Sequence, residues 1–187
     1  MIEYPKIETL YTRDMTTGQI HIGAWRRPEF EYLAKNVWRF TEKVDGTNCR
    51  VMWDGTKVTF GGRTENSQMP TFLLARLQEL FPPEKFIAMG LWSTCLYGEG
   101  YGTKIQKGGG LYKADGVDFV LFDVRIGDWW LEWEAVMELG TALGLRVVPV
   151  VDIGTLYKAT ELVIVGVESA WGPFKAEGLV GRPLVDL

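Results

Sequence analysis

The dipeptide Asp54-Gly55 constrains the fold more than any other feature of this chain, because it joins two short runs of strand-forming residues. The runs are Cys49–Trp53 and Lys57–Phe60. An Asp-Gly pair between two such runs is the strongest short-range signal for a β-hairpin, since both residues tolerate the positive φ angles of a tight turn. The sequence therefore predicts two adjacent antiparallel strands, and the rest of the fold has to be built around them.

Strands and helices are expected to alternate along the rest of the chain. The clearest helix is Pro70–Phe81, because leucines recur there at helical spacing and Pro82-Pro83 follows. Residues 1–35 are rich in turn formers and are expected to be mostly loop. The other predicted elements are helices over Trp133–Leu143 and Thr155–Val167, and strands over Trp38–Lys43, Leu91–Glu99, Val117–Ile126, Arg146–Val151 and Gly178–Arg182. This mixture predicts an α+β fold, and 187 residues fit a single domain over 1–187.

The composition excludes several classes of function. His21 is the only histidine, which rules out sites built from two or three histidines, such as those of most zinc hydrolases. Cys49 and Cys95 form no CxxC pair and are expected to be reduced core residues. A net charge of -4 argues against a protein that coats nucleic acid through phosphates alone. No apolar run approaches the ~20 residues of a membrane span and no signal peptide is evident, so a cytoplasmic monomer without membrane contact is expected.

The strongest candidate for a catalytic residue lies in the segment Glu42-Lys43-Val44-Asp45-Gly46-Thr47-Asn48. Lys43 would act as a nucleophile, although a free lysine amine has a pKa near ~10.4 and has to be neutral to attack. Burial or nearby positive charge lowers that pKa. Asp45 could hold a divalent metal or orient the amine, Gly46 permits close backbone approach to a ligand, and Asn48 offers a donor and an acceptor. An ordinary Asp-Gly hairpin turn is the structural alternative for this segment.

Four further clusters place polar residues beside glycines or at the ends of apolar strands. They are Gly61-Gly62-Arg63-Thr64-Glu65, Leu96-Tyr97-Gly98-Glu99-Gly100-Tyr101-Gly102, Phe119-Val120-Leu121-Phe122-Asp123-Val124 and Lys175-Ala176-Glu177-Gly178-Leu179-Val180. Arg63 could reach a phosphate or a ribose, and the glycines around Glu99 invite close approach of a ligand. Each cluster also has a purely structural explanation: Arg63 as a solvated surface residue, the Glu99 segment as a plain turn, and the Phe122 strand as core packing. No single cluster therefore decides the function.

In their order and spacing, the candidate positions resemble the motifs of the covalent nucleotidyltransferases. The positions are Lys43, Arg63, Glu99, Phe122 and Glu177. That superfamily contains ATP-dependent RNA ligases, DNA ligases and mRNA capping enzymes. Within it, the chain is most similar to the bacteriophage-type RNA ligase domain, related to the nick-sealing RNA ligases, from about Tyr4-Pro5-Lys6-Ile7 to its C-terminus.

The resemblance implies a nucleotidyltransferase (adenylation) fold and a role for each position. Lys43 would carry AMP taken from ATP, and Phe122 would stack on the adenine. Arg63 and Glu99 would contact the ribose and the neighbouring phosphate. Further contacts to the nucleotide are expected from Glu42, Asp45, Gly46, Asn48 and Lys175.

The metal and the partners follow from the same resemblance. Glu177 and Asp45 would bind Mg²⁺ or Mn²⁺, because carboxylate oxygens suit these hard ions. The AMP would move from the lysine to an RNA 5′-phosphate, and a 3′-hydroxyl would displace it to seal the strand. The expected partners are therefore ATP and RNA ends or a nicked duplex, in a reaction of RNA repair.

The chain departs from the family pattern after Glu177. Members place a Lys-x-Lys pair downstream of this strand, where it contacts the α-phosphate, whereas this chain continues as Gly181-Arg182-Pro183-Leu184-Val185-Asp186-Leu187. Either the sequence is C-terminally incomplete, or the protein binds nucleotide and adenylates poorly. Because two cations that favour a neutral Lys43 are missing, the chain as it stands is expected to adenylate weakly or not at all. DNA ligation, capping and a catalytically impaired nucleotide- or RNA-binding module stay open as alternatives.

A basic glycine-rich loop follows Glu99. Its sequence is Gly102-Thr103-Lys104-Ile105-Gln106-Lys107-Gly108-Gly109-Gly110. With Lys113, this loop would guide an RNA backbone or close over the nucleotide, and an ordinary surface loop is the alternative.

Overall fold

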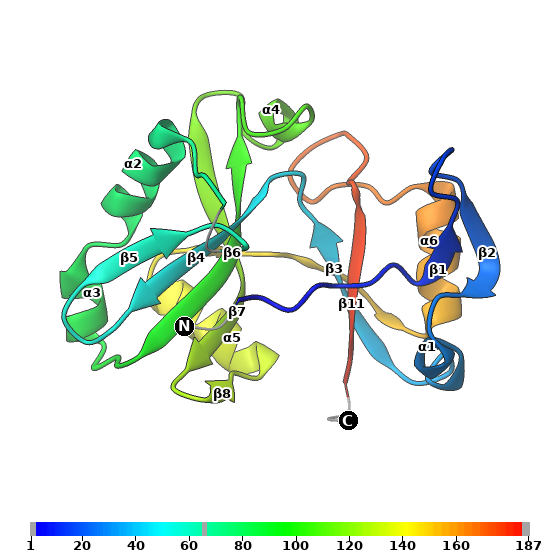
Figure 1. Ribbon diagram of the computed structural model, residues 1–187, viewed down its shortest axis with the longest axis horizontal. Coiled ribbons are helices and arrows are strands. Elements are labelled where there is room, and N and C mark those ends of the chain that lie inside the picture. Colours follow the sequence, from blue (N-terminus) through cyan, green and yellow to red (C-terminus); the bar gives the residue numbers. More distant parts are fainter. Residues whose placement is uncertain (1–2, 65–66, 185–187) are drawn as a thin grey trace.

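The computed structural model describes residues 3–64 and 67–184, and its strands form two main sheets that stand side by side (Figure 1). Glu65 and the C-terminal residues 185–187, which belong to motifs named above, lie outside the described residues. The larger sheet has six strands. In spatial order they are β5 (Val58–Gly61), β4 (Thr47–Trp53), β6 (Thr94–Gly102), β7 (Val117–Ile126) and β8 (Trp129–Trp130), with β9 (Arg146–Val147) paired to β7.

The hairpin predicted at Asp54-Gly55 is confirmed at the edge of this sheet, where β4 pairs antiparallel with β5. The Asp54 carboxylate closes the turn by accepting hydrogen bonds from the backbone N–H groups of Thr56 at 2.8 Å and Lys57 at 2.9 Å. Gly55 has a φ of 97°, which an L side chain rarely adopts. The chemistry of the turn therefore sets the edge of the sheet, and the other side of β4 pairs with β6.

The smaller sheet has three antiparallel strands in the order β10 (Val150–Gly154), β3 (Trp38–Lys43) and β11 (Gly178–Pro183). Only residues 44–46 separate β3 from β4 of the larger sheet. The segment that contains Lys43 is therefore the crossing from one sheet to the other.

The prediction of one continuous strand over Arg146–Val151 is wrong, because the chain divides it between the two sheets. Its first part is β9, beside β7, and its last part begins β10, beside β3. At the break, the Val148 N–H donates to the Leu121 carbonyl of the larger sheet at 2.9 Å, and the Pro149 carbonyl accepts from the Glu42 N–H of the smaller sheet at 3.0 Å. Pro149 has no N–H with which to continue a ladder, so the chain changes sheets there.

The predicted helices are confirmed as α2 (Thr71–Leu80), α5 (Trp133–Ala142) and α6 (Leu156–Val165). Apolar side chains of α2 and α5 share one core with the larger sheet, whose buried members include Leu73, Leu77, Val136, Val51 and Leu121. The buried residues of α6, Leu156 and Ala159, pack on Trp38 and Phe40 of β3. Pro82-Pro83 ends α2 as expected, but Pro83 also begins α3 (Pro83–Ala88), because proline suits the first turn of a helix.

The N-terminal part contains more regular structure than predicted. Residues expected to be loop form an antiparallel ribbon of β1 (Tyr11–Arg13) and β2 (Ile20–Trp25), followed by α1 (Pro28–Tyr32). The aromatic rings of Tyr11 and Trp25 lie 4.9 Å apart, and Trp25 contacts Tyr157 of α6 at 5.9 Å. Most residues of β2 are exposed, so the ribbon lacks the alternation of apolar and polar residues by which a strand is recognised.

Two smaller differences concern the segment around Glu99. The strand expected at Leu91–Glu99 begins later, at Thr94, and runs on to Gly102 as β6. The glycine-rich loop that follows ends in a short helix, α4 (Gly109–Tyr112). Among the described residues, no helix has the length and apolar character that a bilayer crossing requires.

Candidate active site

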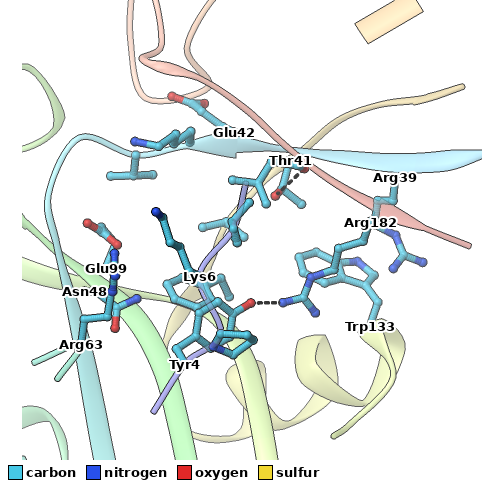
Figure 2. Close-up of a pocket in the computed structure, with 17 residues that line it drawn as sticks. Tyr4, Lys6, Arg39, Thr41, Glu42, Asn48, Arg63, Glu99, Trp133 and Arg182 are labelled. Carbon is cyan, nitrogen blue, oxygen red and sulfur yellow. Dashed lines mark hydrogen bonds between the residues drawn. The ribbon is translucent and has the colours of Figure 1, made fainter. Parts of the chain in front are cut away.

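Residues from both sheets and from the N-terminal segment 4–7 line a pocket of about 280 Å³ (Figure 2). The smaller sheet contributes side chains from β3 and β11, and the larger sheet contributes them from β4, β6 and β7. Of the positions expected at the nucleotide, the pocket brings together Glu42, Lys43, Asn48, Arg63, Glu99 and Phe122. Strand pairing thus gathers in one cavity residues that the sequence spreads over eighty positions.

Lys43 lies at the end of β3, and its amine forms an ion pair with the carboxylate of Glu177. The register of the sheet explains this contact, since Gly178 of β11 lies opposite Lys43 and Glu177 immediately precedes that strand. The two side chains are 48% and 42% exposed, so the amine stays accessible to a ligand. The amine is engaged by this carboxylate, so attack by Lys43 requires the contact to be released.

Glu99 extends from β6 into the same site, where Asn48 of β4 is its neighbour across the ladder. Burial raises the pKa of Glu99 to about 8, Lys43 lowers it, and the negative charges of Glu177 and Asp45 raise it further. Three carboxylates thus act on one another around a single lysine. A bound cation would relieve this repulsion and favour the ionised form of Glu99.

Asp45 and Gly46 lie in the crossing between the sheets and contact neighbouring backbone. Asp45 Oδ2 accepts a hydrogen bond from the Gly108 N–H at 3.0 Å, which ties the glycine-rich loop to the lysine segment. A Cβ atom added at Gly46 would lie 2.4 Å from the carbonyl oxygen of Gly100. Position 46 therefore requires glycine because the backbone of β6 approaches it closely. The sequence predicted a ligand, and not β6, at this position.

Asn48 and Arg63 form the wall of the pocket beside Glu99 (Figure 2). The Oδ1 atom of Asn48 is buried and has no hydrogen-bond partner among the described residues. Arg63 is exposed and makes no ion pair within the described part of the chain. A buried acceptor without a donor is costly, so this wall is suited to a polar ligand that would supply one.

Phe122 of β7 provides the apolar side of the pocket. Its ring lies 5.0 Å from that of Tyr4 at an interplanar angle of 66°, and it packs beside a buried cluster that includes Val44 and Val148. Phe122 and these two valines all line the cavity. The pocket is therefore apolar on this side and charged around Lys43, as a ligand with a flat ring and an anionic group requires.

Glu42 borders the pocket, but its carboxylate is engaged on the other side of β3, and Lys175 lies outside the pocket. The Glu42 side chain is 1% exposed, and its carboxylate accepts hydrogen bonds from the Ser169 hydroxyl at 2.7 Å and the Ala170 N–H at 2.9 Å. In Figure 2 this carboxylate lies on the opposite side of β3 from Tyr4 and Lys6. Lys175 bonds the Gly166 carbonyl and Glu168, and it is not among the residues that line the pocket.

The pocket also contains residues whose roles the sequence did not indicate. They are Tyr4, Lys6, Arg39, Trp133 and Arg182. Tyr4 donates a hydrogen bond to Asp123 Oδ2 at 3.1 Å, and the Arg182 guanidinium contacts both groups. Arg39 stacks 5.2 Å above the Trp133 ring, and the Lys6 amine points toward the end of the pocket that holds Glu99 (Figure 2). Of these residues, only Arg182 could have been expected at the site from the sequence, since it lies on the strand that begins directly after Glu177.

The donor set around Lys43 fits a divalent metal ion. Glu99 and Glu177 offer hard carboxylate oxygens, and burial raises the pKa of Glu99, so a bound cation would stabilise its ionised form. The described residues contain no group of three or more histidine, cysteine or acidic side chains arranged to hold a metal. Water and phosphate oxygens would therefore have to complete the coordination, which is the usual arrangement for Mg²⁺. Asp45, also expected as a ligand, has one oxygen occupied by Gly108.

Comparison with known structures relates this fold to RNA ligases. A Naegleria gruberi RNA ligase mutant with ATP and Mn superposes with a TM-score of 0.68 at 24% identity, over 84% of this chain and 49% of that one. The same ligase with PPi gives a TM-score of 0.68 at 23% identity, over 97% and 58%. This similarity confirms the nucleotidyltransferase fold. The chain spans about half the length of these ligases.

Sequence comparison extends this result to the level of the family. No curated protein sequence matches the chain. The family model described as RNA ligase matches residues 36–187, which include β3, the lysine segment and both sheets. The chain therefore belongs to the RNA ligase family.

Proposed function

We propose that this chain carries out the nucleotidyl-transfer chemistry of an ATP-dependent RNA ligase, with Lys43 as the residue that becomes adenylated. The observation that carries the proposal is the placement of Lys43 at a pocket that is apolar at Phe122 and charged at Glu99 and Glu177. The apolar side suits an adenine ring, and the two carboxylates would hold a divalent metal ion that binds the triphosphate.

In the first step the neutral Lys43 amine attacks the α-phosphorus of ATP. A nitrogen–phosphorus bond forms, the bond from that phosphorus to the bridging oxygen breaks, and pyrophosphate leaves. Catalysis of such a transfer is mainly positioning and stabilisation of charge on the phosphate oxygens. Lys6, Arg63 and Arg182 line the pocket and supply positive charge close to the site.

These cations modify the expectation of weak adenylation. That expectation rests on the absence of a Lys-x-Lys pair after Glu177, but Arg182 lies on β11 and Lys6 reaches the pocket from the N-terminal segment. Arg182 is already paired with Asp123, so part of its charge is compensated. We therefore expect adenylation that is slow but specific for Lys43.

The nucleotide has partners for its other groups. Phe122 offers a ring for the adenine to stack on, and the unpaired Oδ1 of Asn48 would accept a hydrogen bond from it or from the ribose. Glu99 and Glu177 would hold Mg²⁺ or Mn²⁺, which supplies electrostatic stabilisation of the phosphate oxygens when bound. The Naegleria ligase structures with ATP, AMP and Mn support ATP and a divalent metal as the cofactors.

Two further transfers complete the proposed reaction. An oxygen of an RNA 5′-phosphate attacks the AMP phosphorus and releases Lys43, and a 3′-hydroxyl then attacks the RNA 5′-phosphorus and releases AMP. The partners would be RNA ends or a nicked duplex, in RNA repair by a cytoplasmic monomer. DNA ligation and capping would use the same first step with a different acceptor or nucleotide.

Sealing assays distinguish these acceptors. The chain is supplied with nicked duplexes of all-RNA, all-DNA and mixed strands whose 5′-phosphates are already adenylated, so that the slow first step is bypassed. Sealing of an RNA 3′-hydroxyl with little sealing of a DNA one is expected. Preference for the all-DNA nick, or labelling of the protein by GTP in place of ATP, would favour the alternatives.

A further inference from the structure

A second cleft, of about 310 Å³, lies where β6 ends and β7 begins, and within the described part of the chain it shares no lining residue with the Lys43 pocket. Helices α2 and α4, labelled in Figure 1, respectively contain and directly precede two of its lining residues, Arg76 and Lys113. Its charged lining residues are Arg76 of α2, Lys113 just after α4, Asp118 of β7 and Arg146 of β9. Nothing in the proposed adenylation reaction uses these residues.

The cleft is positively charged, although the chain as a whole has a net charge of -4. Asp118 is the only acidic residue among the described lining residues, and it pairs with Arg76 at 3.3 Å and Lys113 at 4.0 Å, while Arg76 also pairs with Glu79 at 3.2 Å. Arg146 makes no ion pair with any described residue. Of the three cations, Arg146 is therefore left without a carboxylate, Lys113 shares Asp118, and Arg76 has two carboxylate partners.

These cations are held in place before any ligand arrives. Arg146 lies opposite Val120 in the β7–β9 pair, and its guanidinium sits 5.2 Å above the Trp171 ring. Stacking on a ring leaves the in-plane N–H groups of an arginine free to donate. Arg76 is oriented by Asp118, which accepts from its Nε. The oriented guanidinium of Arg146, together with the Lys113 ammonium, can therefore donate to the oxygens of a phosphate group.

The cleft is linked to the lysine segment by a short chain of contacts. The Trp171 N–H donates to the Ser169 hydroxyl oxygen at 3.1 Å, and that hydroxyl donates to Glu42 at 2.7 Å. Glu42 precedes Lys43 on β3. Trp171, on which Arg146 stacks, is thus connected through Ser169 to the residue that precedes Lys43. A polynucleotide whose end reaches Lys43 would therefore also come near the cleft.

We propose that this cleft binds a backbone phosphate of the RNA strand, with Arg146 and Lys113 as its principal contacts and Arg76 beside them. The inference rests on the proposed RNA ligase function, since it assigns the partner of that reaction. It adds a phosphate site outside the nucleotide pocket. A free phosphate compound such as pyrophosphate has the same chemistry and is the alternative source of the group.

The test measures binding of a short 5′-phosphorylated RNA with a fluorescent 3′ end by anisotropy, at several KCl concentrations. The variant is the double substitution Arg146→Gln with Lys113→Gln. The control is the double substitution Lys35→Gln with Lys57→Gln, which also removes two positive charges. Both lysines are exposed, and neither forms an ion pair with a described carboxylate. The cleft variant is expected to bind about tenfold more weakly, and the slope of log K against log salt is expected to fall by ~0.7 for each lost contact. Arg146→Lys, which keeps the charge and loses the stacked guanidinium, should bind with an affinity between those of wild type and the cleft variant.

Two further measurements separate the possible outcomes. Adduct formation at Lys43 in the cleft variant should equal that of wild type, so a failure of the cleft is distinguishable from a failure of the ligase proposal. Calorimetric titration with inorganic pyrophosphate should give the same affinity for both proteins. RNA binding equal to that of the control variant would overturn the inference. Loss of pyrophosphate affinity with RNA affinity unchanged would also overturn it, by assigning the cleft to a free phosphate compound.

Discussion

At the scale of single residues, the site is governed by carboxylates placed around one amine. Glu177 pairs directly with Lys43, while Glu99 acts on it from β6 and is itself raised in pKa by burial. Without a bound metal ion, the ionised form of Glu99 is unfavourable in the folded state, because the side chain is buried. The same arrangement is productive once a metal and a triphosphate are present, because opposite charges then share the pocket.

The pKa of Glu99 leads to a prediction about stability and pH. Burial raises this pKa from 4.5 to about 8, so between these values the unfolded chain has lost a proton that the folded chain keeps. Stability therefore falls as pH rises from about 4.5 to about 8. In buffer with EDTA, Glu99→Gln should be roughly 2–4 kcal/mol more stable than wild type at the upper end of this range, with no gain at the lower end. Urea unfolding at a series of pH values measures this difference, and a gain that does not vary with pH would contradict it.

Glu42 provides a second prediction at this scale. Glu42→Ala would leave the Ser169 hydroxyl and the Ala170 N–H without their acceptor, so the free energy of unfolding should drop by about 2 kcal/mol. Glu161→Ala, which removes an exposed carboxylate from α6, is the control and should change stability little. Chemical denaturation followed by tryptophan fluorescence compares the two. Equal stability of both variants would show that Glu42 does not anchor the 169–171 segment.

At the scale of elements, the glycine-rich loop is tied to the lysine segment by Asp45. An added Cβ at Gly108 would lie 2.6 Å from Asp45 Oδ2, whereas one at Gly110 would meet nothing within 4 Å. Gly108→Ala should therefore break the hydrogen bond between Asp45 and the loop, at a cost of about 1–3 kcal/mol, and Gly110→Ala should not. Trypsin should cleave after Lys104 and Lys107 faster in the first variant. Equal cleavage of the two variants would show that Asp45 does not restrain the loop.

At the scale of the whole molecule, a buried network joins the N-terminal segment to both sheets. Asp123 of β7 is 3% exposed and is met by Tyr4 and by Arg182 of β11. Arg182→Ala would leave this buried carboxylate without its cation. Because the arginine side chain is itself 38% exposed, we expect a loss of about 2 kcal/mol, below the 3–5 typical of fully buried pairs. Arg13→Ala is the exposed control, and a thermal unfolding scan that found equal losses would contradict the network's role.

Much of this architecture was predictable from local patterns. The Asp54-Gly55 hairpin and the helices at 71–80 and 133–142 follow from turn chemistry and helical periodicity, which depend on near neighbours. The division of Arg146–Val151 between two sheets could not be predicted from local patterns. It depends on the tertiary fold, which places strands of different sheets on either side of Pro149.

The site was predictable to the extent that its residues lie in motifs. Lys43, Glu99 and Phe122 were identified because each stands in a distinctive segment, and they meet in one pocket. Tyr4 and Lys6 were not assigned roles, since their positions depend on the path of the N-terminal segment across both sheets. The burial of Glu42 could have been anticipated, because adjacent residues of a strand face opposite sides and Lys43 takes the side of the ligand.

The attachment of AMP to Lys43 is the central claim and can be measured directly. The chain is incubated for hours with Mn²⁺ and ATP labelled at the α-phosphate, beside Lys43→Ala and Lys43→Arg, and labelled peptides are mapped by mass spectrometry. We predict a slowly formed adduct on Lys43 alone, removed by pyrophosphate and prevented by EDTA. An adduct that persists in Lys43→Ala, or the absence of any adduct in a wild-type chain that binds ATP, would contradict the account.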